Sequence, residues 1–225
     1  FTGLDAAGAD PFGLACAQAA DVCDAGLVVY DLAHDRLRAA IVFAPEVPLR
    51  RAASMLPLCG LGFQNALGAI GPPEVPVHLD WSGGIYLNGG HCGALNIAAS
   101  GTDPDTVPAW LVVGLTLELW PPSDETGLTP DATALYAEGC GEVDAVSLLE
   151  AWVRHTLVQI NVWSDEGPAQ LHRNWLDIAQ GKDAGVTVAG QQGIFLGIDE
   201  NMGLLLKTDQ GTRLIALTAL LKEPT

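Results

Sequence analysis

The sequence predicts an α+β fold in two parts, a main domain over residues 1–180 and a small β-barrel domain over residues 181–225. The main domain is indicated by helical stretches with apolar residues three and four apart and by β-rich runs between them. The barrel is indicated by a change near Gly181, after which four short strand-like runs are separated by glycine and turn residues. At 225 residues, with 49% hydrophobic and 16% charged side chains, the chain can bury a core.

The first elements are a helix and a hairpin. Asp10 is a typical helix cap, Pro11 suits the first helical position and Gly26 follows the expected end. The β-rich runs 26–30 and 36–44 flank a short polar connection, which predicts a hairpin.

A helix with a break is expected next. Residues 49–70 are mostly helical in pattern, but Pro57 and the glycines at 60 and 62 interrupt them. Three strands follow over 77–81, 85–87 and 92–99. The last two are joined at Asn88-Gly89, a strong hairpin signal.

The rest of the main domain begins with a long apolar strand over residues 109–119. A loop rich in proline and acidic residues is expected over 120–133. An amphipathic helix over 144–163 and a shorter one over 168–179 complete the domain.

The charge balance disfavours whole classes of partner. Lys and Arg number 10 against 27 Asp and Glu, a net charge of −17 that repels phosphate backbones and anionic lipids. We therefore expect neither a nucleic-acid nor a membrane partner. The longest apolar run, 108–120, is too short to span a bilayer, and no secretory leader opens the chain, so a cytoplasmic location is expected. Five cysteines without a C-x-x-C pair predict neither a disulfide framework nor a metal site.

The order of the motifs resembles that of the biotin protein ligase and lipoate ligase family. The stretch DWSGGIYLNGGHCGAL from Asp80 is similar to the family's Lys-Trp-Pro-Asn-Asp turn followed by Ala-Gly-Ile-Leu, with Trp81 on the family's tryptophan and Gly93-Ala94-Leu95 on its Gly-Ile-Leu. Residues 110–119 resemble its Ile-Gly-Ile-Gly-Ile-Asn-Val-Asn strand, and residues 129–153 resemble its Ala-Thr-Ser-Leu and Glu-x-Gly elements with the following helix. Residues 175–217 resemble its C-terminal SH3-like barrel.

The resemblance implies a biotin/lipoate ligase-like mixed sheet with helices on one side, plus the SH3-like barrel. It also implies a pocket over the sheet for a carboxylic acid, which the family activates with ATP and transfers to a lysine of an acceptor domain. Biotin, lipoate or a related carboxylic acid are then the candidate ligands. The residues placed at this pocket are Trp81, Gly83, Gly84, Asn88, Gly93, Ala94 and Gly114.

Three departures from the family pattern argue against activation by ATP and magnesium. Asp80 stands in place of the family's lysine, and no Lys or Arg occurs between Arg51 and Arg154. Arg36 and Arg38 have strand-like spacing where the family has an Arg- and Gly-rich loop. The family's Asn-Val-Asn is Leu-Glu-Leu here, at residues 117–119. Because activation needs cationic or N–H donors aimed at the phosphates, we expect no ATP-dependent ligation.

Asp80 and Cys92 are the two candidates for residual chemistry. Asp80 could pair with Glu118 for acid–base work or bind a cation, or it could be a plain strand-edge aspartate. Cys92 could carry an acyl group, or it could be a buried strand cysteine whose adjacent residue, His91, points to the opposite face.

Three classes of function remain open from the sequence. The first is a non-catalytic or altered-specificity small-molecule binder that keeps the pocket and has lost the activating charges. The second is a diverged ligase or acyl transferase that modifies a lysine of a carrier domain, using Arg36, Arg38 or Cys92 in unfamiliar roles. The third is a structural or interaction protein whose pocket is filled. The sequence does not specify an oligomeric state.

Overall fold

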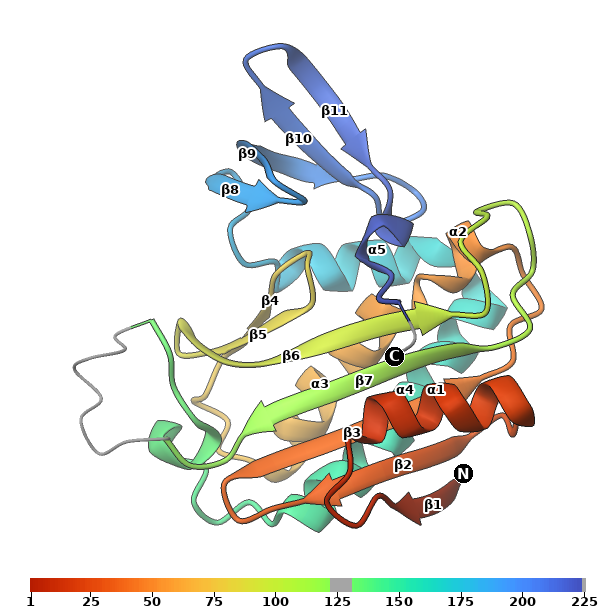
Figure 1. Ribbon diagram of the computed structural model, residues 1–225. Coiled ribbons are helices and arrows are strands. Elements are labelled where there is room, and N and C mark those ends of the chain that lie inside the picture. The colour runs from red at the N-terminus through yellow and green to blue at the C-terminus, as the bar shows by residue number, and fades with distance from the viewer. Residues whose placement is uncertain (122–130, 224–225) are drawn as a thin grey trace.

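The computed structural model describes residues 1–121 and 131–223, which form a seven-stranded sheet, a four-stranded sheet and the helices packed on them (Figure 1). The larger sheet has the order β1-β2-β3-β7-β6-β5-β4. β1 pairs with β2 in parallel and the other neighbours are antiparallel, so the sheet is mixed. Its strands are β1 (Thr2–Asp5), β2 (Leu27–Leu32), β3 (Arg36–Phe43), β4 (Val77–Leu79), β5 (Gly84–Leu87), β6 (Gly90–Ala99) and β7 (Leu111–Glu118).

β1 is a strand that the sequence pattern does not predict. Its four residues, TGLD, are all exposed and pair with β2 at the edge of the sheet. Because neither of its faces is buried, β1 lacks the apolar alternation by which a strand is recognised. The other six strands lie within two residues of their expected ends.

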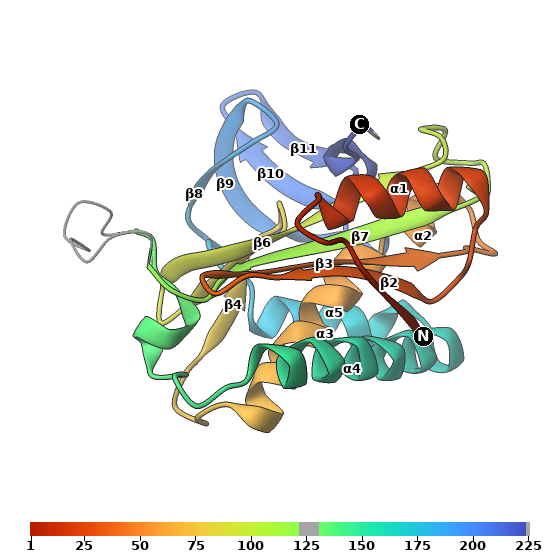
Figure 2. The same cartoon turned by 60° about the horizontal axis from the view of Figure 1, so that its bottom comes forward.

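Helices cover both faces of the larger sheet, whereas the sequence predicts helices on one side (Figure 2). α1 (Pro11–Asp21), capped by Asp10 as predicted, lies on one face. α3 (Met55–Ile70) and α4 (Ala145–Glu166) lie on the other. The second layer forms because the central strands β3 and β7 are apolar on both sides. Toward α1 they present Ala40, Val42 and Val112, and toward α3 and α4 they present Ile41, Val113 and Leu115.

The helical stretch 49–70 breaks earlier than predicted. α2 (Leu49–Ala52) ends at once, and α3 then runs unbroken through Pro57, Gly60 and Gly62. Pro57 is the third residue of α3, where a missing N–H costs no helical hydrogen bond. The stretch is long and apolar enough to cross a membrane, yet 72% of its most apolar window is buried inside the protein, as in a core helix.

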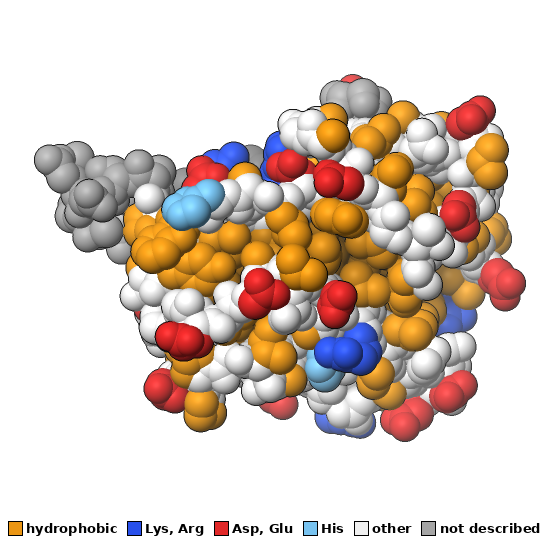
Figure 3. Space-filling view, turned by 90° about the horizontal axis from the view of Figure 1, so that it is seen from below, with side chains coloured by type: hydrophobic (Ala, Val, Ile, Leu, Met, Phe, Trp, Pro, Cys, Tyr) orange, Lys and Arg blue, Asp and Glu red, His pale blue; other side chains and the backbone are white. Residues whose placement is uncertain are grey.

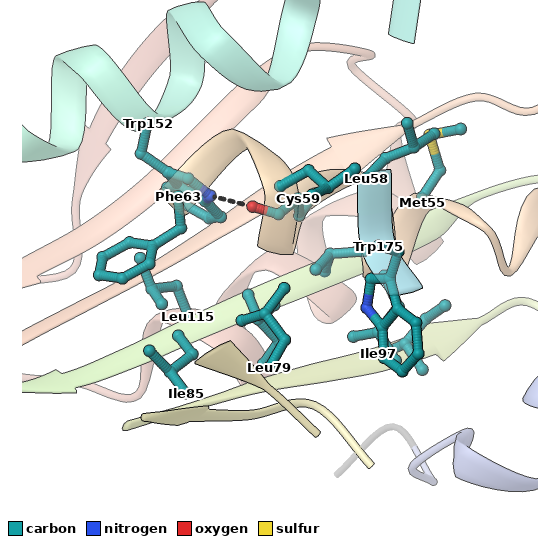
Figure 4. Packing of buried hydrophobic residues seen from close by; sticks show 14 of the residues in the cluster. Met55, Leu58, Cys59, Phe63, Leu79, Ile85, Ile97, Leu115, Trp152 and Trp175 are labelled. Carbon is teal, nitrogen blue, oxygen red and sulfur yellow. Dashed lines mark hydrogen bonds between the residues drawn. The ribbon is translucent and has the colours of Figure 1, made fainter. Parts of the chain in front are cut away.

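The main hydrophobic core lies between the sheet and the pair α3 and α4 (Figure 4). Trp152 of α4 is fully buried and donates its indole N–H to the Cys59 carbonyl oxygen of α3 at 3.0 Å. The core extends to α5 (Pro168–Asp177), where the Trp175 ring lies 6.2 Å from the Phe195 ring of the second sheet. The two sheets therefore share one continuous core.

The four strands predicted after Gly181 are present as β8 (Gly185–Val188), β9 (Gln191–Ile198), β10 (Leu204–Thr208) and β11 (Gly211–Ile215). They form an antiparallel sheet in the order β11-β10-β9-β8. Within the described part of the chain β8 does not pair with β11, so the sheet is open and the expected closed SH3-like barrel is not seen.

Two of the described segments outside the strands and the longer helices are short 3₁₀ helices. The last of the four strand-like runs expected after Gly181 covers residues 212–220, but β11 ends at Ile215 and Leu217–Leu220 form the 3₁₀ helix η3. Leu221 then pairs with Ile97 of β6. The 3₁₀ helix η2 (Leu135–Glu138) precedes α4. Most of the loop predicted over 120–133 lies outside the described residues.

Candidate functional site

Two of the predicted pocket residues lie in one row across the larger sheet. Gly84 of β5 pairs with Ala94 of β6, Ala94 with Thr116 of β7, and Thr116 with Arg38 of β3. Residues paired directly across antiparallel strands point to the same face, so these four positions share one side of the sheet. Gly114, two residues before Thr116, has the same orientation.

Helix α1 covers the Gly114 end of this face. A methyl group at position 114 would lie 2.6 Å from the Phe12 ring of α1, so a larger residue there would require the Phe12 side chain to shift. Gly114 therefore lies under α1 and does not line either of the cavities that include Trp81.

The arginines on this face are paired with carboxylates. Arg38 contacts Asp31 at 2.6 Å, and this hydrogen bond lowers the pKa of Asp31. Arg36 contacts Glu118 at 3.1 Å. Both arginines lie on β3 at the predicted strand spacing. Both arginines are thus held on acidic partners, Arg38 the more buried of the two and Arg36 with 43% of its side chain exposed.

Asp80 closes the turn between β4 and β5. Its Oδ1 accepts the Gly84 backbone N–H at 2.8 Å, and its Oδ2 accepts the Tyr86 hydroxyl at 3.0 Å. Burial, followed by the negative charge of Asp80 and the hydrogen bond to it, raises the pKa of Tyr86 to about 12. Tyr86 thus remains a donor to Asp80 at neutral pH. Asp80 and Glu118 have separate partners and do not act as a hydrogen-bonded pair.

Trp81 joins the two sheets. Only 5% of its surface is exposed, and its Nε1–H donates to the Met202 carbonyl oxygen at 2.7 Å. Gly83, two residues later, has a φ of 98° and lies against the Leu95 carbonyl, so a side chain would be strained and crowded there. The pocket residues Trp81 and Gly83 therefore hold the turn against both β6 and the second sheet.

Two cavities lie beside Trp81. The smaller one has room for about 10 Å³, the size of one water molecule, and includes Gly83 and Met202 in its wall. The larger one is a cleft of about 220 Å³ between the two sheets. We call it the Trp81 cleft, and its polar and aromatic lining consists of Asp80, Trp81, Ser82, Tyr86, Gln180, Thr187 and Phe195.

Asn88 and Gly93 serve the sheet rather than the cleft. Asn88 lies exposed in the β5–β6 turn with a φ of 49°, and its Nδ2 donates to Glu138 Oε2 at 2.6 Å. Gly93 lies so close to β7 that a methyl group there would sit 3.0 Å from the Leu117 Cα. The positive φ of Asn88 and the close approach of Gly93 to β7 explain why these residue types occur here, without a bound ligand.

A bulge in β6 turns Cys92 into the core. The pairing with β5 passes from Gly93 directly to His91, so Cys92 is an extra residue in the strand. Its side chain is fully buried and its Sγ–H donates to the Glu118 carbonyl oxygen at 3.6 Å. Burial, followed by the charge of Glu118, raises the pKa of this thiol to about 12. The thiolate that acyl transfer requires is therefore disfavoured.

The structure adds four polar lining residues that the sequence pattern does not single out, namely Ser82, Tyr86, Gln180 and Thr187. Tyr86 is two residues from Gly84 in the same strand. Because side chains alternate between the two faces of a strand, the sequence could have predicted that both residues point to the same face. Gln180 and Thr187 come from a region about 100 residues away, and no local pattern reveals that they meet Asp80. Among the described residues, no cluster of three or more His, Cys, Asp or Glu side chains is placed to hold a metal ion.

A larger concavity of about 570 Å³ lies between the end of β3, α3 and the end of α4. Its lining is mainly apolar and includes Phe43, Met55, Ile160 and Trp163. Figure 3, which views the molecule from the β1 edge of the sheet, shows hydrophobic side chains gathered over the middle of that side among scattered acidic ones. This concavity contains none of the residues that the sequence predicts at the pocket, so we place the candidate site at the Trp81 cleft.

Comparison with known proteins relates both parts of the chain to recorded families. The model of the biotin/lipoate A/B protein ligase family matches residues 1–177. Residues 184–223, which contain the second sheet, match a domain of unknown function, DUF4444. In sequence, a biotin–[acetyl-CoA-carboxylase] ligase of Paracoccus denitrificans is 24% identical over 183 residues, which cover 78% of this chain and 75% of that protein.

Solved structures agree with this relationship. A biotin protein ligase-like protein of unknown function from Silicibacter sp. TM1040 is 56% identical and superposes with a TM-score of 0.94, covering 99% of this chain and 97% of that one. The biotin protein ligase of Aquifex aeolicus is 16% identical with a TM-score of 0.74, covering 96% and 94% of the two chains. The latter likeness is one of fold.

Proposed function

The chain belongs to the biotin/lipoate A/B protein ligase family, and from this premise we propose that it binds a small molecule without activating it through ATP. The bound molecule would lie in the Trp81 cleft, between the two sheets. The single observation that carries the proposal is the state of Asp80, which occupies the position where the family resemblance places a lysine. Its carboxylate is fixed by Gly84 and Tyr86 and lines the cleft.

Activation of a carboxylate by ATP brings several negative charges together, so it depends on cations and N–H donors at the phosphates. A carboxylate in that place repels them, and one lost donor alone costs a factor of roughly 10² to 10³ in rate. The nearest arginines by strand order, Arg36 and Arg38, are paired with Glu118 and Asp31. The chain also has no Lys or Arg between Arg51 and Arg154 that could replace them.

The test is pyrophosphate release from ATP and magnesium with biotin, lipoate or octanoate. We expect no release above that of a protein-free control with any of the three acids. An active biotin protein ligase assayed in parallel shows that the conditions support the reaction. Robust acid-dependent release by this protein would overturn the proposal.

Thermal melting separates binding from activation. A ligand at about a hundred times its dissociation constant adds roughly 2.7 kcal/mol to the free energy of unfolding. A rise in melting temperature that is the same with and without ATP and magnesium supports a protein that binds the acid without activating it. A shift that appears only with ATP and magnesium would contradict it.

A diverged ligase or acyl transferase is the second candidate. It is favoured by the similarity to the Paracoccus denitrificans ligase, which extends over 183 residues. The Aquifex aeolicus protein has been solved with biotin and ATP, which makes these the first molecules to test here. This candidate predicts the ATP-dependent shift and pyrophosphate release that the first one excludes.

A further inference from the structure

We propose that the Trp81 cleft binds a small organic cation, with an ammonium group against Asp80 and an aryl or alkyl body against the aromatic side chains. This inference rests on the proposed function, in which the cleft binds without activating, and it names the chemical class of the ligand.

The carboxylate of Asp80 lacks a cationic partner. Its two hydrogen bonds come from an amide and a phenol, both neutral. The ion pairs formed within residues 1–121 and 131–223 involve Arg36, Arg38 and Arg50, and none of them reaches Asp80. A carboxylate has about four acceptor sites, so Asp80 keeps capacity for further donors. An ammonium group would supply both the donors and the missing charge.

The lining around Asp80 suits an ammonium group with an apolar body. Aromatic rings attract cations through their faces, and the half-buried ring of Tyr86 is the most accessible aromatic side chain of the cleft. Trp81 and Phe195, which are 5% and 1% exposed, close its wall. An ammonium nitrogen has three N–H donors, and the hydroxyl of Thr187 and the amide oxygen of Gln180 are acceptors in the same wall. The volume of about 220 Å³ restricts the ligand to a small molecule.

The net charge of the whole protein also favours a cationic ligand over an anionic one. A net charge of −17 raises the local concentration of cations and lowers that of anions near the surface. A carboxylic acid in the cleft would meet Asp80, and no Lys or Arg is among the described residues that line the cleft. The cleft is thus poorly suited to the anionic ligands of a ligase and well suited to an amine.

Three probes with the same aryl body test the charge directly. They are 2-phenylethylamine, 2-phenylethanol and 3-phenylpropanoate, titrated into the unaltered protein by calorimetry at fixed ionic strength. We expect the amine to bind at least about tenfold more tightly than the alcohol and the acid, since hydrogen bonds to charged groups are the stronger ones. Equal binding of amine and alcohol, tighter binding of the acid, or no binding of the amine would overturn the inference.

Variants locate the site. Asp80→Asn removes the charge and is expected to weaken amine binding at least about tenfold, while Asp209→Asn, an exposed change of equal charge in the β10–β11 turn, leaves it within about twofold. Unchanged binding in Asp80→Asn would overturn the inference, and if that variant does not fold, the three probes on the unaltered protein decide.

The outcome is distinguishable from a failure of the proposed function. If an acid binds without ATP and the amine does not bind, the protein is still a binder as proposed, and only the inference of a cationic ligand fails. Pyrophosphate release would instead remove the proposed function, whatever the amine does.

Discussion

Gly62 of α3 lies directly against Thr156 of α4. A methyl group at position 62 would sit 2.9 Å from the Thr156 Cα and 2.9 Å from its backbone nitrogen. Because these are backbone atoms, no side-chain rotation can relieve the contact. The two helices can pack at this distance only with glycine at position 62.

Substitution Gly62→Ala is therefore expected to destabilise the protein. Forcing an extra methyl group into a packed core costs typically 1 to 3 kcal/mol, which exceeds the gain of about 1 kcal/mol from the better helix propensity of alanine. Urea unfolding followed by circular dichroism measures the change.

Gly68→Ala is the matched control in the same helix. Position 68 is exposed, and a methyl group there meets no atom within 4 Å. This variant should be stabilised by roughly 0.5 to 1 kcal/mol, because only the propensity term remains. Equal effects at positions 62 and 68 would show that the contact with Thr156 does not determine the packing of α3 on α4.

Trp81→Phe tests the attachment of the second sheet. The change removes the indole N–H and leaves the Met202 carbonyl oxygen without its buried donor, which costs about 1 to 3 kcal/mol. Hydrogen exchange should accelerate more in β8 to β11 than in the larger sheet, because the lost bond joins the two. Trp120→Phe, at a residue that is 45% exposed, is the control and should leave both sheets unchanged.

The sequence predicts helices and strands well where burial of one face imposes a regular spacing of apolar residues. Six strands of the larger sheet and α1, α3, α4 and α5 follow from apolar spacing and, for α1, from the cap Asp10. β1 was missed because both of its faces are exposed. The helix break was misplaced because Pro57 falls in the first turn of α3, where it is tolerated.

The site is predicted only where its residues are close in sequence. Trp81 and Gly83 share one turn, so their common location follows from the motif. The bulge that buries Cys92 depends on the register between β5 and β6, which sequence patterns do not specify. That Asp80 and Thr187 line the same cleft depends on how the second sheet packs on the first, which is a tertiary property.

Cys92 is expected to resist alkylation in the folded protein. Its thiol is fully buried and burial raises its pKa to about 12, so both access and thiolate are lacking at neutral pH. Cys23, which is partly exposed, should be modified before it. Mass spectrometry after brief treatment with iodoacetamide measures the order, and early labelling of Cys92 would restore the acyl-carrier hypothesis.

Asp80→Asn is expected to lower the pKa of Tyr86. Burial is the larger cause of its value of about 12 and stays in the variant, while the charge of Asp80 is removed, so the pKa should fall toward 10.0 without reaching it. A raised folded-state pKa contributes stability that is present below pH 10 and is lost as the pH rises toward 12. The loss of unfolding free energy across this window should thus be smaller in Asp80→Asn. Tyrosinate absorbance follows the ionisation, and subtracting the titration of Tyr86→Phe assigns the signal to Tyr86. An equal Tyr86 pKa in the unaltered protein and in Asp80→Asn would show that Asp80 does not control Tyr86.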